Sequence, residues 1–84
     1  MVYQVKLKKS VIKSLEKVDE PNYSQIKKAI YKLADNPKPQ GCIKLKGRNG
    51  YRIRVGNYRI IYDIFDKILV VEVVALGHRK EIYG

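Results

Sequence analysis

The sequence predicts an α+β fold in which an antiparallel helix hairpin packs on one face of a mostly antiparallel sheet of four or five strands. The first part of the chain contains two segments with the apolar spacing of amphipathic helices. The later part alternates apolar and polar residues around two turn signals, as antiparallel strands do. The length of 84 residues indicates one domain spanning residues 1–84, with elements in the order β-α-α-β-β-β.

The chain is expected to begin with a strand and a helix. Residues 2–7 alternate well enough for a strand. From about residue 9 to 18 the period changes, because Val11, Leu15 and Val18 follow the i, i+4, i+7 spacing of one helix stripe. This stripe needs an apolar surface to cover it.

A second helix is expected directly after the first. Asp19-Glu20-Pro21 ends the first helix and begins the next, since proline is tolerated in a first helical turn. Apolar residues at positions 26, 29, 30, 33 and 34 form its stripe, and Asn36-Pro37-Lys38-Pro39 stops it near Asp35. The short connection makes the two helices an antiparallel hairpin.

After the helix hairpin the sequence offers a candidate short strand at residues 42–45 and predicts three further strands, over residues 51–55, 58–65 and 68–76. The loop Gly47-Arg48-Asn49-Gly50 follows the first of them. Gly56-Asn57 is a two-residue hairpin signal between the second and third. Asp66-Lys67 is expected to form a tight turn before the last strand.

The hairpin at Gly56-Asn57 gathers three arginines on one face. If Val55 lies opposite Tyr58, then Arg54 lies opposite Arg59, and successive side chains alternate between the two faces. One face is then apolar or aromatic throughout: Tyr51, Ile53, Val55, Tyr58, Ile60, Tyr62 and Ile64, continued by Leu69, Val71, Val73 and Ala75. The other, called the arginine face below, carries Arg52, Arg54, Arg59, Ile61 and Asp63, continued by Val70, Glu72, Val74 and Leu76. We expect the helices to cover the apolar face.

The composition indicates an anionic partner. The chain has 18 Lys and Arg against 8 Asp and Glu, a formal net charge of +10. Such a bias suits a nucleic acid, an acidic protein or an anionic membrane surface. The alternative is a solvated basic surface without a dedicated partner.

The cysteine and hydropathy patterns exclude several classes of protein. Cys42 is the only cysteine, so no intrachain disulfide can form, and a cytoplasmic location is expected. One cysteine and one histidine, His78, cannot assemble a local zinc site. No segment has the apolar length of a signal peptide or a transmembrane helix. We therefore expect no metal, no cofactor and no membrane partner.

The three arginines favour an anion site on the arginine face. Like charges directly opposite one another across strands are destabilising. Asp63 and Glu72 on the same face allow the alternative of a salt-bridged surface, but two carboxylates do not neutralise three guanidiniums. Arg79 adds a fourth just after the last strand. The guanidinium fork matches phosphate oxygens, which favours a phosphate-binding role.

His78 and Tyr83 lie in the polar terminal stretch HRKEIYG. In most proteins such a histidine is an exposed bystander, and a penultimate tyrosine ties down the end of the chain. Beside arginines, the histidine can exchange a proton near neutral pH and the tyrosine can stack on a base.

The helix hairpin, the segment YRIRVGNYRIIYDI and the closing GHRKEIY resemble the RelE branch of the RelE/ParE toxin superfamily over nearly the whole chain. The resemblance implies a ribosome-dependent endoribonuclease that cuts messenger RNA in the A site and is inhibited by a cognate antitoxin. Arg52 and Arg54 match two basic residues before the hairpin turn, and Arg59 matches one after it. Arg79 and Tyr83 match residues near the family's C-terminus. The best-known members have lysines where this chain has Arg52 and Arg54, and arginine is effectively never deprotonated.

The resemblance implies attack of the RNA 2′-hydroxyl on the adjacent phosphorus without a metal. In this mechanism Arg59, supported by Arg79, stabilises the transition state, while Arg52 and Arg54 hold the flanking backbone. Tyr83 would stack on a base, and His78 would assist proton transfer. Additional RNA contacts are expected from three basic residues before the hairpin: Lys44, Lys46 and Arg48.

Two alternatives remain open at the level of sequence. One is a ParE-like toxin that poisons DNA gyrase, and the other is a basic RNA- or ribosome-binding module without catalysis. In the favoured interpretation the partners are the ribosome, messenger RNA and an acidic or amphipathic antitoxin that forms a hetero-oligomer with the toxin.

Overall fold

The computed structural model describes residues 2–78. Its elements in chain order are β1 (Gln4–Leu7), α1 (Lys9–Glu16), α2 (Asn22–Lys32), β2 (Ile43–Lys44), β3 (Gly50–Val55), β4 (Tyr58–Phe65), a 3-10 turn (Asp66–Ile68) and β5 (Val70–His78). The predicted elements are all present, with ends that differ by up to three residues, the largest difference being at the end of α2. The α+β class is confirmed.

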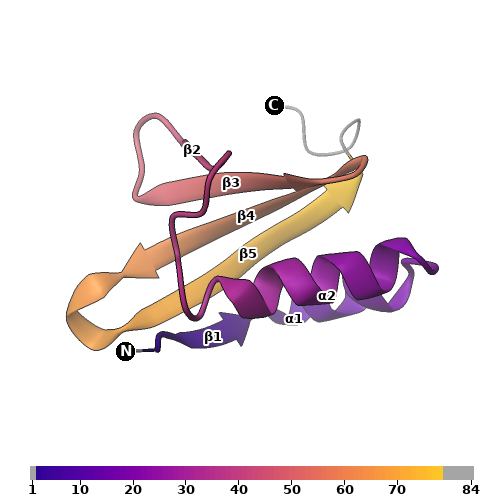
Figure 1. Ribbon diagram of the computed structural model, residues 1–84, viewed down its shortest axis with the longest axis horizontal. Helices are drawn as coiled ribbons and strands as arrows, with labels where there is room; N and C mark the ends of the chain where they lie inside the picture. Colours follow the sequence, from indigo (N-terminus) through magenta and orange to yellow (C-terminus); the bar gives the residue numbers. More distant parts are fainter. Residues whose placement is uncertain (1, 79–84) are drawn as a thin grey trace.

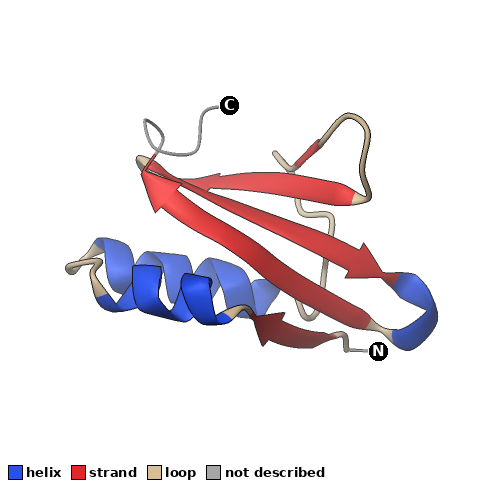
Figure 2. Cartoon of the chain, turned by 180° about the vertical axis from the view of Figure 1, so that it is seen from behind, coloured by secondary structure: helices blue, strands red, loops and turns tan. Residues whose placement is uncertain are grey.

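Within the described residues, five strands form one sheet in the order β1-β5-β4-β3-β2. Strands β2 to β5 pair antiparallel with their neighbours, whereas β1 pairs parallel with β5. Strands β1 and β2 are the two edges of the sheet. Both helices lie between them in the chain, so the helical segment carries the chain from one edge of the sheet to the other (Figure 1). Both helices lie on the same side of the sheet, as the view from behind confirms (Figure 2).

The helices form where their apolar residues recur at helical spacing. In α1, Val11 and Leu15 are buried, and Val18 just beyond its end is buried too. In α2 the buried residues are Ile26 and Ile30. These side chains face the sheet, so the predicted helix hairpin and its apolar stripes are confirmed.

The core between the helices and the sheet is built around the central strands β4 and β5. Its fully buried large side chains are Val11, Ile26, Leu33, Ile60, Tyr62, Val71 and Val73. The Tyr62 hydroxyl donates a 2.7 Å hydrogen bond to the carbonyl oxygen of Pro37, which ties the α2–β2 connection to β4. Burial raises the pKa of Tyr62, because the phenolate would lose its hydration in the core.

The connection from β4 to β5 is longer than the predicted two-residue turn. The 3-10 turn Asp66–Ile68 is followed by Leu69 in the left-handed conformation, with φ 53°. The N-terminal segment secures this turn: the Tyr3 hydroxyl donates a 2.6 Å hydrogen bond to Asp66, and the Gln4 amide donates to the Leu69 carbonyl at 2.8 Å. The hydrogen bond to Asp66 raises the pKa of Tyr3.

Strand β5 departs from regular alternation at Val74. Ile61 pairs with Ala75, whereas the neighbouring Tyr62 pairs with Val73. Val74 is therefore the extra residue of a β-bulge, in which two residues of one strand oppose one residue of the other.

The bulge corrects two predicted positions. Ala75 was expected on the apolar face but lies on the arginine face, opposite Ile61. Leu76 was expected on the arginine face but lies opposite Ile60, with 6% of its surface exposed. The physical reason is that the bulge shifts the alternation by one residue, which brings the larger Leu76 side chain into the core.

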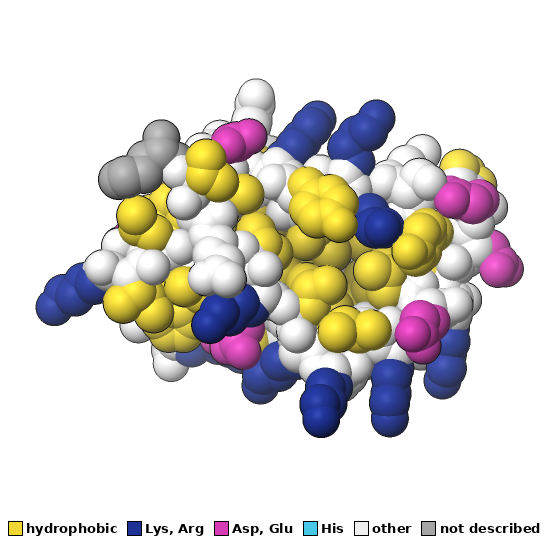
Figure 3. Space-filling view, turned by 90° about the horizontal axis from the view of Figure 1, so that it is seen from below, with side chains coloured by type: hydrophobic (Ala, Val, Ile, Leu, Met, Phe, Trp, Pro, Cys, Tyr) yellow, Lys and Arg dark blue, Asp and Glu magenta, His cyan; other side chains and the backbone are white. Residues whose placement is uncertain are grey.

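The helix side of the molecule also carries exposed hydrophobic surface. Seen from below, hydrophobic side chains gather near the middle of this face, with basic side chains around them (Figure 3). On α1, Ile12 is 43% exposed, and on α2, Tyr31 is 64% exposed. The Lys27 Nζ lies 5.3 Å from the ring centroid of Tyr23 and 5.9 Å from that of Tyr31, within reach of a cation–π attraction.

Candidate nucleic-acid interface

The β3–β4 hairpin has the predicted register. Arg54 pairs with Arg59, and Arg52 pairs with Ile61. Gly56 in the turn has φ +58°, a conformation that favours glycine. Because the alternate residues of both strands face the helices, all three arginines belong to the helix-free side of the sheet.

The three arginines differ in accessibility. Arg54 is exposed, Arg52 is half-buried, and Arg59 has only 3% of its surface exposed. Arg59 lies on β4 between Arg54 on β3 and Gly77 on β5. The last of these presents no side chain. Arg54 is therefore the member of this row that a ligand can reach directly.

The acidic residues of the arginine face lie in a separate row of the sheet. Asp63 pairs with Glu72, and Glu72 pairs with Lys6 on β1. Asp63 accepts a 2.8 Å hydrogen bond from the Arg48 guanidinium, with which it forms an ion pair. The Asp63 carboxylate is thus engaged by a loop arginine. The row formed by Arg52 and Ile61 lies between Asp63 and the row that contains Arg54.

The additional basic residues expected to contact RNA occupy different places. Arg48 lies over the arginine face through its contact with Asp63. Lys44 pairs with Tyr51, so its side chain belongs to the opposite side of the sheet edge. Lys46 is exposed in the loop before β3.

His78 lies at the end of β5 and pairs with Tyr58. The two rings make an edge-to-face contact with centroids 5.6 Å apart. Tyr58 packs against the core, so the bulge at Val74 places His78 on the helix side of the sheet rather than beside Arg54. Two expected site residues, Arg79 and Tyr83, lie outside the described residues.

A cavity of about 300 Å³ adjoins the arginines at the outer edge of β3. Its lining residues are Gln40, Gly41, Ile43, Arg52, Ile53 and Arg54. The sequence predicted the two arginines but not Gln40 or Gly41, because a turn before a two-residue strand carries no periodic signal. The glycine at position 41 was the one signal in the sequence for a turn here, and in the structure it adopts φ +92°, a conformation that favours glycine.

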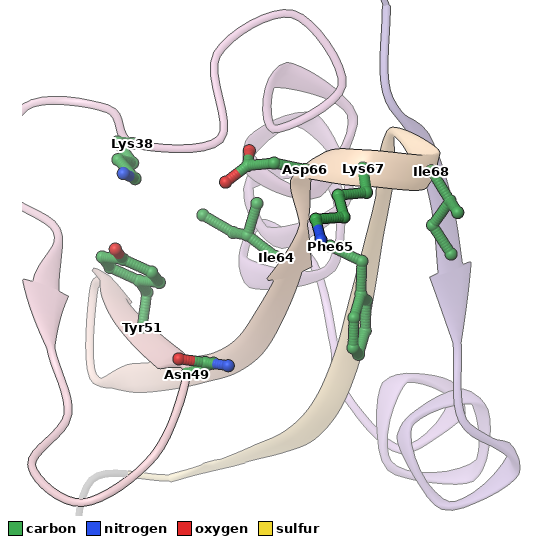
Figure 4. Close-up of a pocket in the computed structure, with 8 residues that line it drawn as sticks. All are labelled: Lys38, Asn49, Tyr51, Ile64, Phe65, Asp66, Lys67 and Ile68. Atoms are coloured by element: carbon green, nitrogen blue, oxygen red, sulfur yellow. The ribbon is translucent and has the colours of Figure 1, made fainter.

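A second cavity lies at the opposite end of β4, where the 3-10 turn meets the edge of β3 (Figure 4). It is lined by Lys38, Asn49, Tyr51, Ile64, Phe65, Asp66, Lys67 and Ile68. The Lys38 Nζ lies 5.5 Å from the Tyr51 ring centroid. This cavity contains the carboxylate of Asp66 and lies away from the arginine row, so it is a weaker candidate for an anion.

Two further findings concern metals and membranes. Among residues 2–78, no three or more His, Cys, Asp or Glu side chains are grouped so that they could hold a metal ion. Over the same part of the chain, no helix has the length and apolar character needed to cross a membrane.

Comparison with known proteins identifies the family. Residues 5–83 match the model of the ParE toxin of the type II toxin–antitoxin system parDE. The chain belongs to this toxin family. A RelE-like toxin protein of Escherichia coli is 35% identical over 83 residues, covering 95% of this chain and 86% of the relative.

Solved structures support the same assignment for this RelE-like toxin. The archaeal RelE–RelB complex from Pyrococcus horikoshii contains a chain that matches with a TM-score of 0.86 and 32% identity, covering 96% of this chain and 99% of that one. The isolated Escherichia coli RelE toxin matches with a TM-score of 0.79 and 25% identity, covering 90% and 83% of the two chains. The toxin is therefore similar to RelE proteins over nearly its full length.

Proposed function

We propose that this RelE-like toxin is a metal-independent endoribonuclease that cleaves messenger RNA in the ribosomal A site. The observation that carries the proposal is the cross-strand pair Arg54–Arg59, with Arg52 on the same face. Like charges in such a pair weaken the sheet. A phosphodiester backbone bound across them removes that repulsion, and the guanidinium fork suits its oxygens.

The proposed reaction is an intramolecular transfer within the RNA. The 2′-hydroxyl oxygen attacks the adjacent phosphorus, the bond from phosphorus to the 5′-oxygen breaks, and a 2′,3′-cyclic phosphate forms. The proton of the 2′-hydroxyl passes to a base, and the departing 5′-oxygen gains a proton. Extra negative charge develops on the phosphoryl oxygens, so donors already aimed at them give the largest rate contribution.

The arginines divide these tasks according to their accessibility. Exposed Arg54 and half-buried Arg52 bind the RNA backbone on either side of the reacting phosphate. Arg59 stabilises the transition state, together with Arg79. Because Arg59 is only 3% exposed, this assignment requires the surface above its side chain to open when RNA binds.

The deciding experiment adds the purified toxin to a bacterial translation extract and maps new messenger RNA 5′ ends. We expect cuts inside codons, and these cuts should require ribosomes. The cleavage rate should fall by at least about 100-fold in Arg59→Ala, the loss typical of one transition-state donor. Arg59→Ala removes a buried side chain, so two further variants keep the test valid if it fails to fold: the conservative Arg59→Lys, and Arg54→Ala at an exposed position. Lys67→Ala is the control for loss of an exposed basic side chain away from the arginine row. Cuts that persist in Arg59→Ala would contradict the assigned role.

A second function is favoured by the family description, which names ParE toxins. In that case the toxin would poison DNA gyrase and leave RNA intact. Growth arrest without messenger RNA cuts, accompanied by inhibition of gyrase in a supercoiling assay, would support it. A third outcome, ribosome binding without cuts or gyrase inhibition, would indicate a non-catalytic RNA- or ribosome-binding module.

We further propose that an antitoxin controls the toxin and forms a hetero-oligomer with it in the cytoplasm. The solved relative from Pyrococcus horikoshii is a complex of RelE with RelB. The net charge of +10 favours an acidic or amphipathic partner segment that covers the arginine face or displaces the C-terminus. The complex should lose RNA cleavage, and an antitoxin complex with full cleavage would overturn this part of the proposal.

A further inference from the structure

The outer edge of β3 is only partly covered by its neighbour. Strand β2 has two residues, and these pair with Tyr51 and Arg52. Within the described chain, β3 beyond Arg52 pairs on one side alone, with β4. The 300 Å³ cavity lies along this open stretch, between residues 40–43 and the strand.

The backbone of β3 directs polar groups toward this cavity. The Leu45 amide donates a 2.9 Å hydrogen bond to the Gly50 carbonyl, so the polar backbone groups of Gly50 point toward β2. In a strand, alternate residues point their N–H and C=O groups the same way. Those of Arg54 therefore also point outward, and Arg54 lies past the last residue that pairs with β2.

The cavity combines groups that suit one nucleotide. Arg52 and Arg54 contribute guanidiniums, Gln40 contributes an amide that can both donate and accept hydrogen bonds, and Ile43 contributes an apolar surface that is 49% exposed. Among residues 2–78, no carboxylate lines this cavity, whereas Asp66 lines the cavity at the other end of β4. Its volume is at the lower end of small-molecule sites, which fits a single nucleotide.

We infer that this cavity is a nucleotide subsite, which binds the nucleotide adjacent to the scissile phosphate. The phosphate lies on Arg52 and Arg54, the edge of the base meets the Gln40 amide and the Arg54 backbone, and the face of the base packs against Ile43. Because Arg54 pairs with Arg59, the subsite leads directly to the proposed reaction centre. The inference rests on the proposed function and adds the element that selects the base at the cut.

The first test is binding of a non-cleavable probe, a 2′-O-methyl RNA trinucleotide, to the full-length toxin, followed by NMR. We expect the amide signals of residues 40–43 and of Arg54 to shift. Gln40→Ala and Ile43→Ser should each weaken binding about fivefold, the effect of losing one hydrogen bond or one apolar contact. Ile68→Ser is the matched control, because Ile68 is an exposed isoleucine (68%) at the other end of β4. Equal losses in the two isoleucine variants, or no shifts at residues 40–43, would overturn the subsite.

The second test measures which codons are cut in the translation extract. Gln40→Ala should change the distribution of cut sites by base identity while cleavage continues. If the wild type cuts RNA and both subsite variants retain its sites and its trinucleotide affinity, the subsite is overturned and the nuclease proposal stands. If the wild type makes no cuts but the trinucleotide shifts residues 40–43, the subsite is supported as an RNA-binding site and the nuclease proposal fails.

Discussion

The guanidinium of Arg48 reaches the carboxylate of Asp63 at 2.8 Å by passing directly over the α-carbon of Gly50. A Cβ atom at position 50 would lie 2.7 Å from the Arg48 Nε and 3.0 Å from the Asp63 oxygen. Glycine is thus the residue that lets the loop arginine lie flat on the arginine face. The pair holds one basic side chain away from the row that contains Arg54.

We predict that Asp63→Asn strengthens binding of non-cleavable RNA, because Arg48 is released and one negative charge is removed from the arginine face. The salt dependence of binding should steepen by about 0.7 in log–log slope for one added phosphate contact. Arg48→Ala should weaken RNA binding, since it removes a positive charge and leaves the Asp63 carboxylate unneutralised on the arginine face. Fluorescence anisotropy at several salt concentrations measures both effects.

Two variants separate release of Arg48 from a general charge effect. Gly50→Ala displaces the Arg48 side chain by steric contact without changing the net charge, so it should shift affinity in the same direction. Asp66→Asn removes the same charge at the far end of β4. Equal strengthening by Asp66→Asn and Asp63→Asn would mean that net charge alone accounts for the change. The exposed ion pair contributes well under about 1 kcal/mol to folding, so stability should barely move.

We predict that Tyr62→Phe lowers the free energy of unfolding by about 1–2 kcal/mol at neutral pH, because the Pro37 carbonyl loses its hydrogen bond. The loss should shrink as the pH rises above the ordinary tyrosine pKa of 10.0. The pKa of Tyr62 is raised in the folded state, so only the unfolded chain releases this proton near its ordinary value. The stabilisation is therefore complete below that value and declines above it.

Urea unfolding of the wild type and Tyr62→Phe over a range of alkaline pH values checks this prediction. Tyr31→Phe is the control, because Tyr31 is 64% exposed and its hydroxyl should contribute little. A stability difference between wild type and Tyr62→Phe that stays constant through pH 10.0 would contradict the assignment of the raised pKa to the folded state.

We predict that Leu76→Ala lowers stability by about 2–4 kcal/mol, the cost of a cavity in a packed core. Leu76 is 6% exposed and lies opposite Ile60 because of the bulge. Val74→Ala should cost less than about 1 kcal/mol, since this bulge residue is half-buried. Thermal or urea unfolding distinguishes the two; a loss for Leu76→Ala no larger than that for Val74→Ala would indicate regular alternation, which would place both side chains on the arginine face instead of bringing Leu76 into the core.

The bulge marks where the sequence ceases to predict the sheet. The β3–β4 register was predictable because Gly56-Asn57 leaves a two-residue loop and a slip of one residue would bury Arg54 in the core. In β5 the run Val-Val-Glu-Val-Val-Ala-Leu has apolar residues at both odd and even positions, so either set could face the core. Nothing in the local sequence therefore distinguishes a bulge at Val74 from continuous pairing. The tertiary packing of Leu76 decides between them.

The same distinction applies to the candidate site. Alternation on the hairpin correctly placed Arg52, Arg54 and Arg59 on one face. The cavity beside them depends on the length of β2 and on the turn at Gly41, which are set by long-range packing rather than by local pattern. The roles of Arg79 and Tyr83 remain predictions, because these residues lie outside the described part of the chain.

The position of His78 against Tyr58 leads to the last prediction. The two ring centroids lie 5.6 Å apart, and the pair lies on the helix side of the sheet, whereas Arg54 faces the other side. A side chain in this place can assist proton transfer only after it moves. We therefore predict that His78→Ala retains messenger RNA cleavage within about tenfold of the wild type, below the 10²–10⁴-fold loss expected for a true general base.

The pH dependence of cleavage separates assistance from general-base catalysis. If His78 were the base, the wild-type rate would show a pH-dependent transition that vanishes in His78→Ala. We expect the two pH profiles to have the same shape, with His78→Gln close to the wild type. A His78→Ala variant that binds ribosomes normally but makes no cuts would show instead that the end of β5 rearranges to bring this imidazole to the RNA.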